Sequence, residues 1–330
     1  MHTLNAVAEI LAAGAVITVI ATRLIERAHP PRGRFIAIGG LRQHVVELGE
    51  STGAQGDAQG GAREKAPIVL IHGAGCNLQD MRLALGERLA ARHRVILIDR
   101  AGMGWSERAG RRGSSPGYQA AMLRDVLDRL GVERAIVVGH SWGGTLAATF
   151  ALDHPQRVAG LVLLAPPLYP LRRSMTWLYA VFAMPVAGWL YARTLALPLG
   201  APFIGLGLGS AFLPQLPPRG YIKRTAAMLL LRPATFLANA RDVADLKTNL
   251  APQIVRYASL AAPAVIITGS SDMVVPPRHH AFAFAEAVPA AKLVVLPGIG
   301  HMLHHVAADR VIAEIEAIAA RPRHTKEDML

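Results

Sequence analysis

The eight residues at 137–144, Val-Val-Gly-His-Ser-Trp-Gly-Gly, constrain the fold of this chain more than any other stretch. They join an apolar run that predicts a buried strand to a second run that predicts a helix. The Gly-x-Ser-x-Gly pattern at the junction predicts a tight turn that pushes the Ser141 hydroxyl above the sheet edge. Such a turn requires small residues on both sides of the serine, and Gly139 and Gly143 meet this need. The pattern predicts a nucleophilic serine at position 141.

Seven further apolar runs predict strands, separated in most of the chain by segments with a helical pattern. Runs of this kind, without polar alternation, are typical of a parallel sheet covered on both faces. The first two, joined by Gly39 and Gly40, predict an antiparallel start. A mobile loop is expected over 49–66. The predicted strands besides 134–138 are 34–38, 41–48, 67–71, 94–99, 160–165, 264–269 and 292–297.

Five motifs at the ends of these runs together resemble the α/β-hydrolase fold family. They are His-Gly-x-Gly from His72, Asp-Arg-x-Gly-x-Gly-x-Ser from Asp99, Gly-x-Ser-x-Gly from Gly139, Gly-x-x-Asp from Gly269 and Gly-x-Gly-His from Gly298. The resemblance extends from about Phe35 to Ala319. It implies an α/β fold with a mostly parallel eight-stranded sheet flanked by helices, and a helical lid inserted into it.

The predicted division of the chain follows from this resemblance and from composition. The hydrolase core is expected at 34–165 and 263–322, with the lid between them at 166–262. An apolar N-terminal helix is expected at 1–33 and a polar tail at 323–330.

A serine hydroxyl is a poor nucleophile at neutral pH, so it needs a base and a group that orients the base. In this fold the acid and the histidine follow the serine along the chain. Asp272 comes directly after a predicted strand, and His301 follows the last strand through a glycine-rich loop. We therefore predict a Ser141–His301–Asp272 triad. Three other carboxylates are expected to be solvated or to cap helices: Asp153, Asp242 and Asp245.

The oxyanion of the tetrahedral intermediate needs preorganised N–H donors. The elbow geometry predicts the backbone amide of Trp142 as one donor. The family resemblance implies the backbone amide of Ala74 as the other, with Gly75 as the alternative. His72 and residues 99–106 are expected to brace this rim rather than to react.

The remaining reactive side chains give no second catalytic centre. Cys76 is the only cysteine, which excludes an intrachain disulfide, and no base is predicted beside it. No metal-ligand cluster, phosphate loop or dinucleotide fingerprint is recognised, so no metal and no cofactor are expected. Five histidines are expected to serve packing or the surface: His140, His279, His280, His304 and His305.

The segment 4–22 is apolar apart from Asn5 and Glu9, and it is long enough to span a bilayer. Its basic flank follows it, which predicts an anchored protein with the catalytic part on the cytoplasmic side. The alternative is a soluble cytoplasmic protein in which this helix packs on the body. The net charge of +12 fits a membrane surface, because the chain has no signature of nucleic-acid binding.

The expected lid is unusually apolar and rich in aromatic residues, Trp189 among them. We expect it either to line an apolar acyl pocket and lie on the bilayer, or to form a compact cap over a small pocket. Because Ser141 must meet Asp272 and His301 on one side of any membrane, this segment can cross it only an even number of times.

The sequence thus predicts a serine hydrolase that acts on a small-molecule substrate and cleaves a carboxylic ester with an apolar acyl group through an acyl-enzyme. The alternatives on the same triad are a carbon–carbon bond hydrolase, an amidase, a thioesterase and a cofactor-free haloperoxidase. A non-catalytic binding protein of this fold is the alternative from another class. Serine at 141 argues against dehalogenase and epoxide hydrolase chemistry, which uses aspartate there. The oligomeric state is left open.

Overall fold

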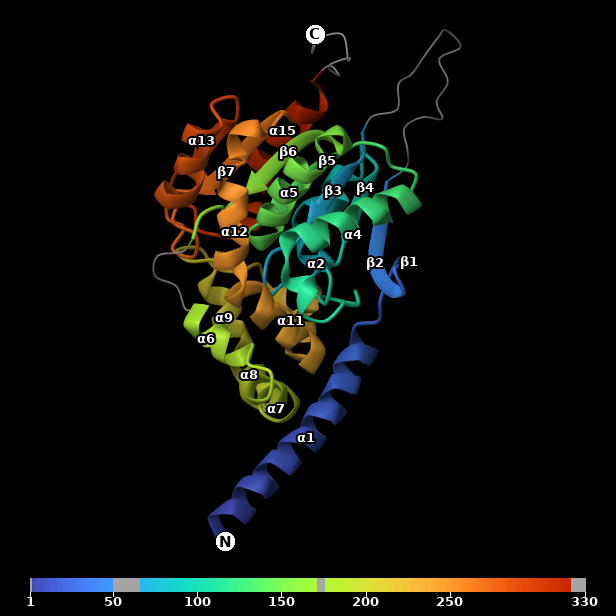
Figure 1. Ribbon diagram of the computed structural model, residues 1–330, viewed down its shortest axis with the longest axis vertical. Helices are drawn as coiled ribbons and strands as arrows, with labels where there is room; N and C mark the ends of the chain where they lie inside the picture. The colour runs from blue at the N-terminus through green and yellow to red at the C-terminus, as the bar shows by residue number, and fades with distance from the viewer. Residues whose placement is uncertain (1, 50–65, 171–175, 322–330) are drawn as a thin grey trace.

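The computed structural model describes residues 2–49, 66–170 and 176–321, and an eight-stranded sheet lies at its centre (Figure 1). The strand order is β1-β2-β4-β3-β5-β6-β7-β8. The β1–β2 and β2–β4 pairs are antiparallel and all later pairs are parallel. This confirms the predicted mostly parallel sheet. The strands are β1 Arg34–Ile38, β2 Leu41–Leu48, β3 Ile68–Ile71, β4 Val95–Ile98, β5 Ala135–His140, β6 Val158–Leu164, β7 Ala264–Gly269 and β8 Lys292–Leu296.

Of the loop predicted over 49–66, only Gly49 and Ala66 are among the described residues, and the expected tail at 323–330 lies outside them.

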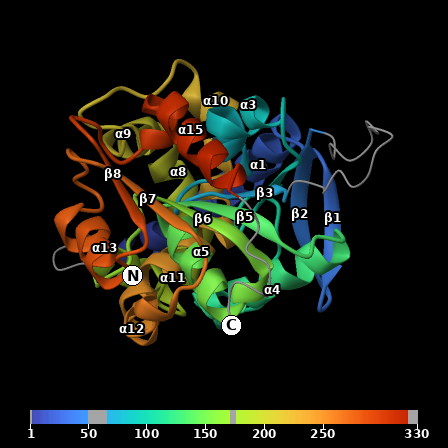
Figure 2. The same cartoon turned by 90° about the horizontal axis from the view of Figure 1, so that it is seen from above.

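Helices cover both faces of the sheet because successive strand residues point to opposite sides (Figure 2). Val137 of β5 joins one apolar core and its neighbour Val138 joins the other. The first core includes residues of α4 Pro116–Arg129, α5 Trp142–Asp153, α12 Leu246–Ile254 and α13 Ala283–Ala287. The second includes residues of α2 Leu78–Met81, α3 Glu87–Leu89, α14 Leu303–Val306 and α15 Ala308–Ala319.

The parallel strands end at a common edge, and this edge gathers the predicted site. β3 is followed by His72, β5 by Ser141, β7 by the turn that holds Asp272, and β8 by the loop that ends in His301. In open α/β sheets, ligands bind outside these carboxyl ends.

A helical insertion follows β6 and lies at this end of the molecule, together with the N-terminal helix α1 His2–Ala28 (Figure 1). We use the name insertion for its described part, residues 166–170 and 176–262. Helix α1 packs along α7 and α8, and its N-terminal part projects beyond the body. The remaining insertion helices are α6 Thr176–Phe182, α7 Ala187–Thr194, α8 Ala196–Gly200, α9 Ile204–Ser210, α10 Tyr221–Arg224 and α11 Pro233–Ala244.

Candidate active site

Ser141 stands on the sharp turn between β5 and α5. Its backbone has φ 51° and ψ −123°, a conformation that L-residues adopt only under strain. A Cβ atom on Gly139 would overlap the carbonyl of Gly143, and one on Gly143 would overlap the carbonyl of His72. Both positions therefore need glycine. The local geometry is that of the predicted nucleophile elbow.

His301 and Asp272 come together at the same edge. Nδ1 of His301 lies 2.8 Å from Oδ2 of Asp272, and both side chains are buried. The other oxygen of Asp272 accepts the backbone amides of Val274, at 2.9 Å, and Val275, at 2.8 Å. The carboxylate is thus held by its own turn and directs the imidazole, which leaves Nε2 as the nitrogen available for proton transfer.

His140, directly before the serine, ties the elbow to the histidine loop. Its Nε2 lies 3.2 Å from the backbone carbonyl oxygen of His301, and the two rings are 4.9 Å apart. Within the described residues the Ser141 hydroxyl forms no hydrogen bond with Nε2 of His301. Catalytic hydrogen bonds are often long without substrate and shorten in the reacting complex.

The segment after β3 approaches the serine closely. A Cβ atom on Gly73 would lie 3.1 Å from Cβ of Ser141, so the Ala74 amide follows directly at the site. The amides of Ala74 and Trp142 have no hydrogen-bond partner among the described residues. The Gly75 amide donates to Oδ1 of Asn239 at 2.7 Å, so it is already engaged. This favours Ala74 over Gly75 as the second donor to an oxyanion.

The residues expected to brace the rim of the oxyanion site form the hydrogen bonds that this role needs. Asp99 accepts the backbone amides of Leu78, at 2.8 Å, and Trp105, at 2.9 Å, and its Oδ2 lies 2.7 Å from Nδ1 of His44. Nε2 of His72 accepts the Arg100 amide at 3.0 Å. Burial and the charge of Arg100 lower the pKa of His72 to about 4, so this imidazole is neutral and structural.

Asp242 of α11 was expected to be solvated, and this expectation was wrong. The side chain is fully buried and forms ion pairs with Arg100, at 2.6 Å, and Arg108, at 2.8 Å. Its backbone carbonyl accepts the indole N–H of Trp142 at 3.0 Å, and the Arg100 guanidinium lies 4.2 Å from the centre of that ring. The insertion is therefore tied to the residue next to the serine.

Another buried carboxylate, Asp80, escaped the sequence analysis. Its oxygens lie 2.9 Å from Nε2 of His304 and 2.8 Å from Nε2 of His305, and it accepts the Tyr221 hydroxyl at 2.7 Å. Although burial opposes the charge, the two imidazoles lower the pKa of Asp80 well below its usual range. The network joins α2, behind the oxyanion segment, to α14, directly after His301. A lone aspartate on a predicted helix gives no sequence signal of such a contact.

Asp80 also belongs to a group of side chains whose spacing could hold a metal ion. One ligand atom each of Asp80, His140 and His304 lies within 4.8 Å of the others. Because three donors already occupy the Asp80 oxygens, the observed role of this group is structural. Burial raises the pKa of the Cys76 thiol well above its usual value, so this cysteine is not an activated nucleophile.

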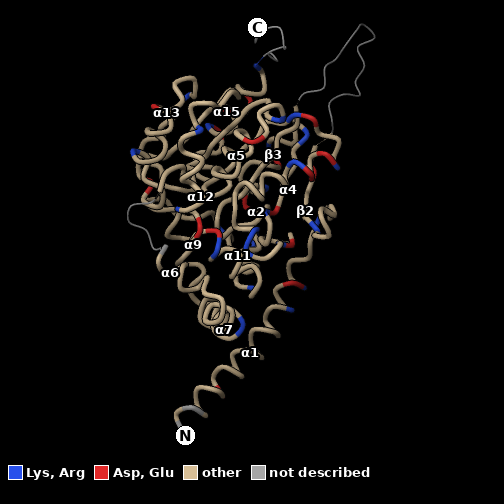
Figure 3. The backbone as a smooth tube through the Cα atoms, viewed as in Figure 1, with Lys and Arg blue, Asp and Glu red and all other residues tan. Residues whose placement is uncertain are grey.

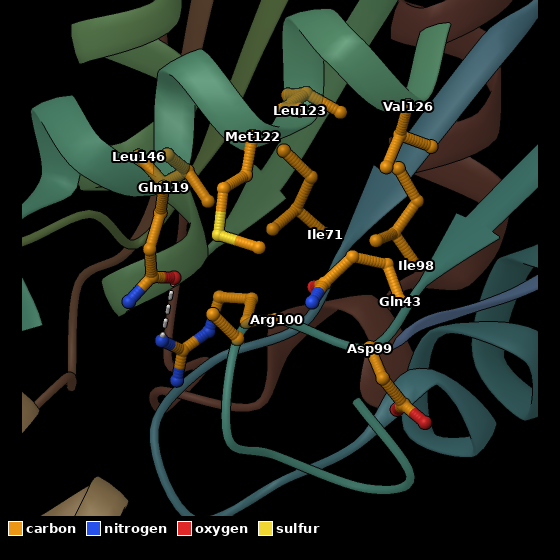
Figure 4. A pocket seen from close by; sticks show the side chains of 11 residues that line it. Gln43, Ile71, Ile98, Asp99, Arg100, Gln119, Met122, Leu123, Val126 and Leu146 are labelled. Carbon is orange, nitrogen blue, oxygen red and sulfur yellow. Dashed lines mark hydrogen bonds between the residues drawn. The ribbon is translucent and has the colours of Figure 1, made fainter. Parts of the chain in front are cut away.

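One small cavity lies under Arg100, between the sheet and α4 (Figure 4). Its volume is about 20 Å³, and the Arg100 guanidinium at its wall donates to Oε1 of Gln119 at 3.5 Å. Neither Ser141 nor His301 lines it. A space of this size holds about one water molecule, so it is not a substrate site.

Comparison with known proteins assigns the chain to a family. A family model described as the alpha/beta hydrolase fold matches residues 66–308, most of the chain. The chain belongs to the α/β-hydrolase fold family. This confirms the family resemblance and the fold class, and the chain is accordingly a hydrolase of this fold.

This α/β hydrolase is similar to the following two relatives and one solved structure. An uncharacterised protein of Mycobacterium tuberculosis is 31% identical over 76% of this chain and 74% of its own. A 2-hydroxymuconate semialdehyde hydrolase of Pseudomonas putida is 27% identical over 88% of this chain and 95% of its own. A crystal structure of an α/β-hydrolase fold protein from Burkholderia ambifaria has a TM-score of 0.69 at 23% identity, covering 86% of this chain and 96% of that one.

Proposed function

We propose that this protein hydrolyses a carboxylic ester with an apolar acyl group through an acyl-enzyme on Ser141. The supporting observation is the strained Ser141 backbone at the same sheet edge as the His301–Asp272 pair. Strain of this kind persists where the surrounding structure enforces it, and it is frequent at reacting residues.

In the proposed mechanism, His301 accepts the proton of the Ser141 hydroxyl as the oxygen attacks the ester carbonyl. The amides of Ala74 and Trp142 donate to the resulting oxyanion. His301 then gives its proton to the departing alcohol. A water molecule, activated by the same imidazole, releases the acid and restores the serine. Asp272 orients the imidazole throughout.

An apolar acyl group is suggested by the side chains above the oxyanion segment. Built at Gly75, a Cβ atom would lie 3.7 Å from Leu230 and 3.9 Å from Leu208, both of the insertion. We propose that the insertion serves as a lid and that these leucines contact the acyl chain.

A carbon–carbon bond hydrolase on the same triad is the second candidate, because the Pseudomonas putida relative that covers most of this chain is a 2-hydroxymuconate semialdehyde hydrolase. Purified protein assayed on p-nitrophenyl esters and on 2-hydroxymuconate semialdehyde separates the two candidates. We expect ester turnover to dominate. Dominant turnover of the semialdehyde would replace the ester proposal.

A fluorophosphonate probe tests the nucleophile itself. We expect it to label the wild-type protein at Ser141 and to leave Ser141→Ala unlabelled. A non-catalytic binding protein of this fold would take no label in either form.

We further propose that α1 anchors the protein in a membrane, with the catalytic part on the cytoplasmic side. One stretch of it, Asn5–Ala28, is long and apolar enough to cross a bilayer, and little of it is buried. Full-length protein should pellet with membranes and need detergent, whereas a chain starting at Arg32 should be released by a milder treatment and still cleave a water-soluble ester. Full-length protein that stays in the high-speed supernatant would contradict the anchor.

A further inference from the structure

Between Ala6 and Thr22, helix α1 has an apolar surface interrupted only by the exposed Glu9, although one face packs on the body. The packed face follows helical spacing through Gly14 and Thr18, which are buried. The opposite face would be polar if it met water. Instead it exposes large apolar side chains: Val7, Ile10, Val16, Ile17, Val19, Ile20 and Leu24.

Helix α1 contacts the insertion within its apolar stretch. A membrane around α1 would therefore also surround the contacting part of the insertion. A Cβ atom on Gly14 would overlap the carbonyl of Thr194, so α1 and α7 touch at backbone level there. Arg23, the first arginine of α1, lies nine residues later. Nine residues of helix rise about 14 Å, and half of a hydrocarbon core is about 15 Å. If α1 spans with Arg23 at the interface, Gly14 and the adjoining end of α7 lie inside the hydrocarbon.

The insertion helices beside α7 have the surface that such a position requires. Between Thr176 and Ser210 the only charged residue is Arg193, and this end of the molecule is nearly free of charge in Figure 3. Its exposed large side chains are apolar: Trp177, Val181, Met184, Val186, Trp189, Leu190, Leu199, Phe203 and Leu206. So many exposed large apolar side chains on neighbouring helices are rare on a water-soluble protein and indicate an interaction site.

The shape of this segment fits entry and exit on one side of a bilayer. The helices over Ala187–Thr194 and Ala196–Ser210 together are apolar and long enough to cross, but they are bent by 64° at the break between them. A bent pair of this kind is either a broken span or a segment that re-enters the side from which it came. We take the second form, because Ser141, Asp272 and His301 must stay on one side.

Basic side chains line a crevice that follows α1 from Ala15 to Arg23, the level at which phospholipid headgroups would lie. A crevice of about 1150 Å³ between α1 and the insertion is lined by six arginines and two glutamates. Arg23 and Arg193 on its wall form no ion pair among the described residues, and the Arg193 guanidinium stacks on Trp189 at 4.3 Å. Unpaired guanidiniums at an interface attract anionic headgroups. The arginines are Arg23, Arg42, Arg108, Arg193, Arg232 and Arg241.

We propose that the insertion is itself embedded in the bilayer, with α6–α9 dipping into one leaflet beside α1, and with the Arg23 end of the arginine crevice at the headgroup level. The partner is a phospholipid bilayer with anionic lipids. This inference rests on the proposed anchor and deepens it, because a lid immersed in lipid would receive its ester substrate from the leaflet rather than from water.

Tryptophan fluorescence tests this without reference to catalysis. Trp177 and Trp189 are 68% and 49% exposed on the insertion, Trp142 is buried, Trp105 is half-buried on the hydrolase core, and α1 has no tryptophan. Full-length protein is reconstituted in phosphatidylcholine–phosphatidylglycerol vesicles with or without acyl chains brominated near the interface. Interfacial helices lie about 5–10 Å deep, so we expect bromines to remove roughly half of the Trp177 and Trp189 emission.

The Trp177→Phe/Trp189→Phe variant is the matched control, because it keeps the apolar surface and retains only Trp105 and Trp142. Its quenching by the brominated lipid should be clearly smaller than that of the wild type, with the remainder from Trp105, which lines the arginine crevice. Vesicle flotation is measured in parallel and reports membrane association, whether or not the insertion enters the bilayer. Protein that floats with vesicles while Trp177 and Trp189 respond to aqueous iodide and not to bromine would overturn the embedded insertion and leave the anchor standing. Shielding of both tryptophans from iodide in a lipid-free dimer would assign this surface to a second copy and would also overturn the proposal.

Discussion

Nδ1 of His301 and Oδ2 of Asp272 lie 2.8 Å apart in a buried contact, which leaves Nε2 as the imidazole nitrogen free to serve the proposed nucleophile, Ser141. Because the three groups act as one unit, Ser141→Ala and His301→Ala should each lower kcat by roughly three orders of magnitude or more. Asp272→Asn should lower kcat somewhat less. Ester turnover is measured on variants whose circular dichroism matches that of the wild type. Wild-type turnover in His301→Ala would exclude the triad.

The sequence was sufficient for the fold and for the members of the site that are local in the chain. The elbow at Ser141, the strand ends before Asp272 and His301, and the bracing role of Asp99 all follow from short motifs. Contacts between residues far apart in the sequence could not be predicted from such motifs. Asp242 looked like a surface carboxylate, because nothing in its own helix indicates that Arg100 and Arg108 fold over it.

The buried Asp242 should be much more sensitive to substitution than a surface carboxylate. Asp242→Asn leaves two guanidiniums with no buried counter-charge, which should lower the free energy of unfolding by about 3–5 kcal/mol. Asp153→Asn is the matched control, because Asp153 pairs with Arg256 at a partly exposed site, and it should change stability by less than about 1 kcal/mol. Denaturant unfolding in detergent measures both. Equal effects would show that burial of the Asp242 pair does not govern stability.

Asn239 links the insertion to the oxyanion segment through its bond to the Gly75 amide. Asn239→Ala should loosen the neighbouring Ala74 amide and lower kcat by roughly tenfold, less than the loss of a direct oxyanion donor. KM should change little, because the side chain does not bind substrate in this mechanism. A change in KM alone would place Asn239 in the substrate pocket instead.

Neutral His72 makes the fold sensitive to acid. In the folded chain its pKa is lowered to about 4, while the unfolded chain binds the proton near pH 6.5. The stabilisation is present above pH 6.5 and is lost as the pH falls toward 4, where protonation of Nε2 breaks the bond to the Arg100 amide. The loss should reach about 3 kcal/mol. Unfolding measured between pH 7 and 4 should therefore have a smaller pH dependence in His72→Gln than in the wild type, and equal slopes would contradict this account.

The dependence of kcat/KM on acyl-chain length tests which side chains line the acyl pocket. The candidates are the leucines near Gly75 and the aromatic residues of the insertion. Sequence reasoning pointed to Trp189, but this side chain is half-exposed, stacks on Arg193 and is not within 4 Å of a Cβ atom built at Gly75. Leu230 approaches the oxyanion segment instead.

Each buried methylene should add up to about 0.8 kcal/mol, roughly a fourfold gain in kcat/KM per carbon until the pocket is filled. Leu230→Ala should flatten this rise in a p-nitrophenyl ester series, whereas Trp189→Ala in detergent should preserve it. Acetate esters that are best by tenfold in the wild type would exclude an acyl pocket and leave a compact cap over a small cavity.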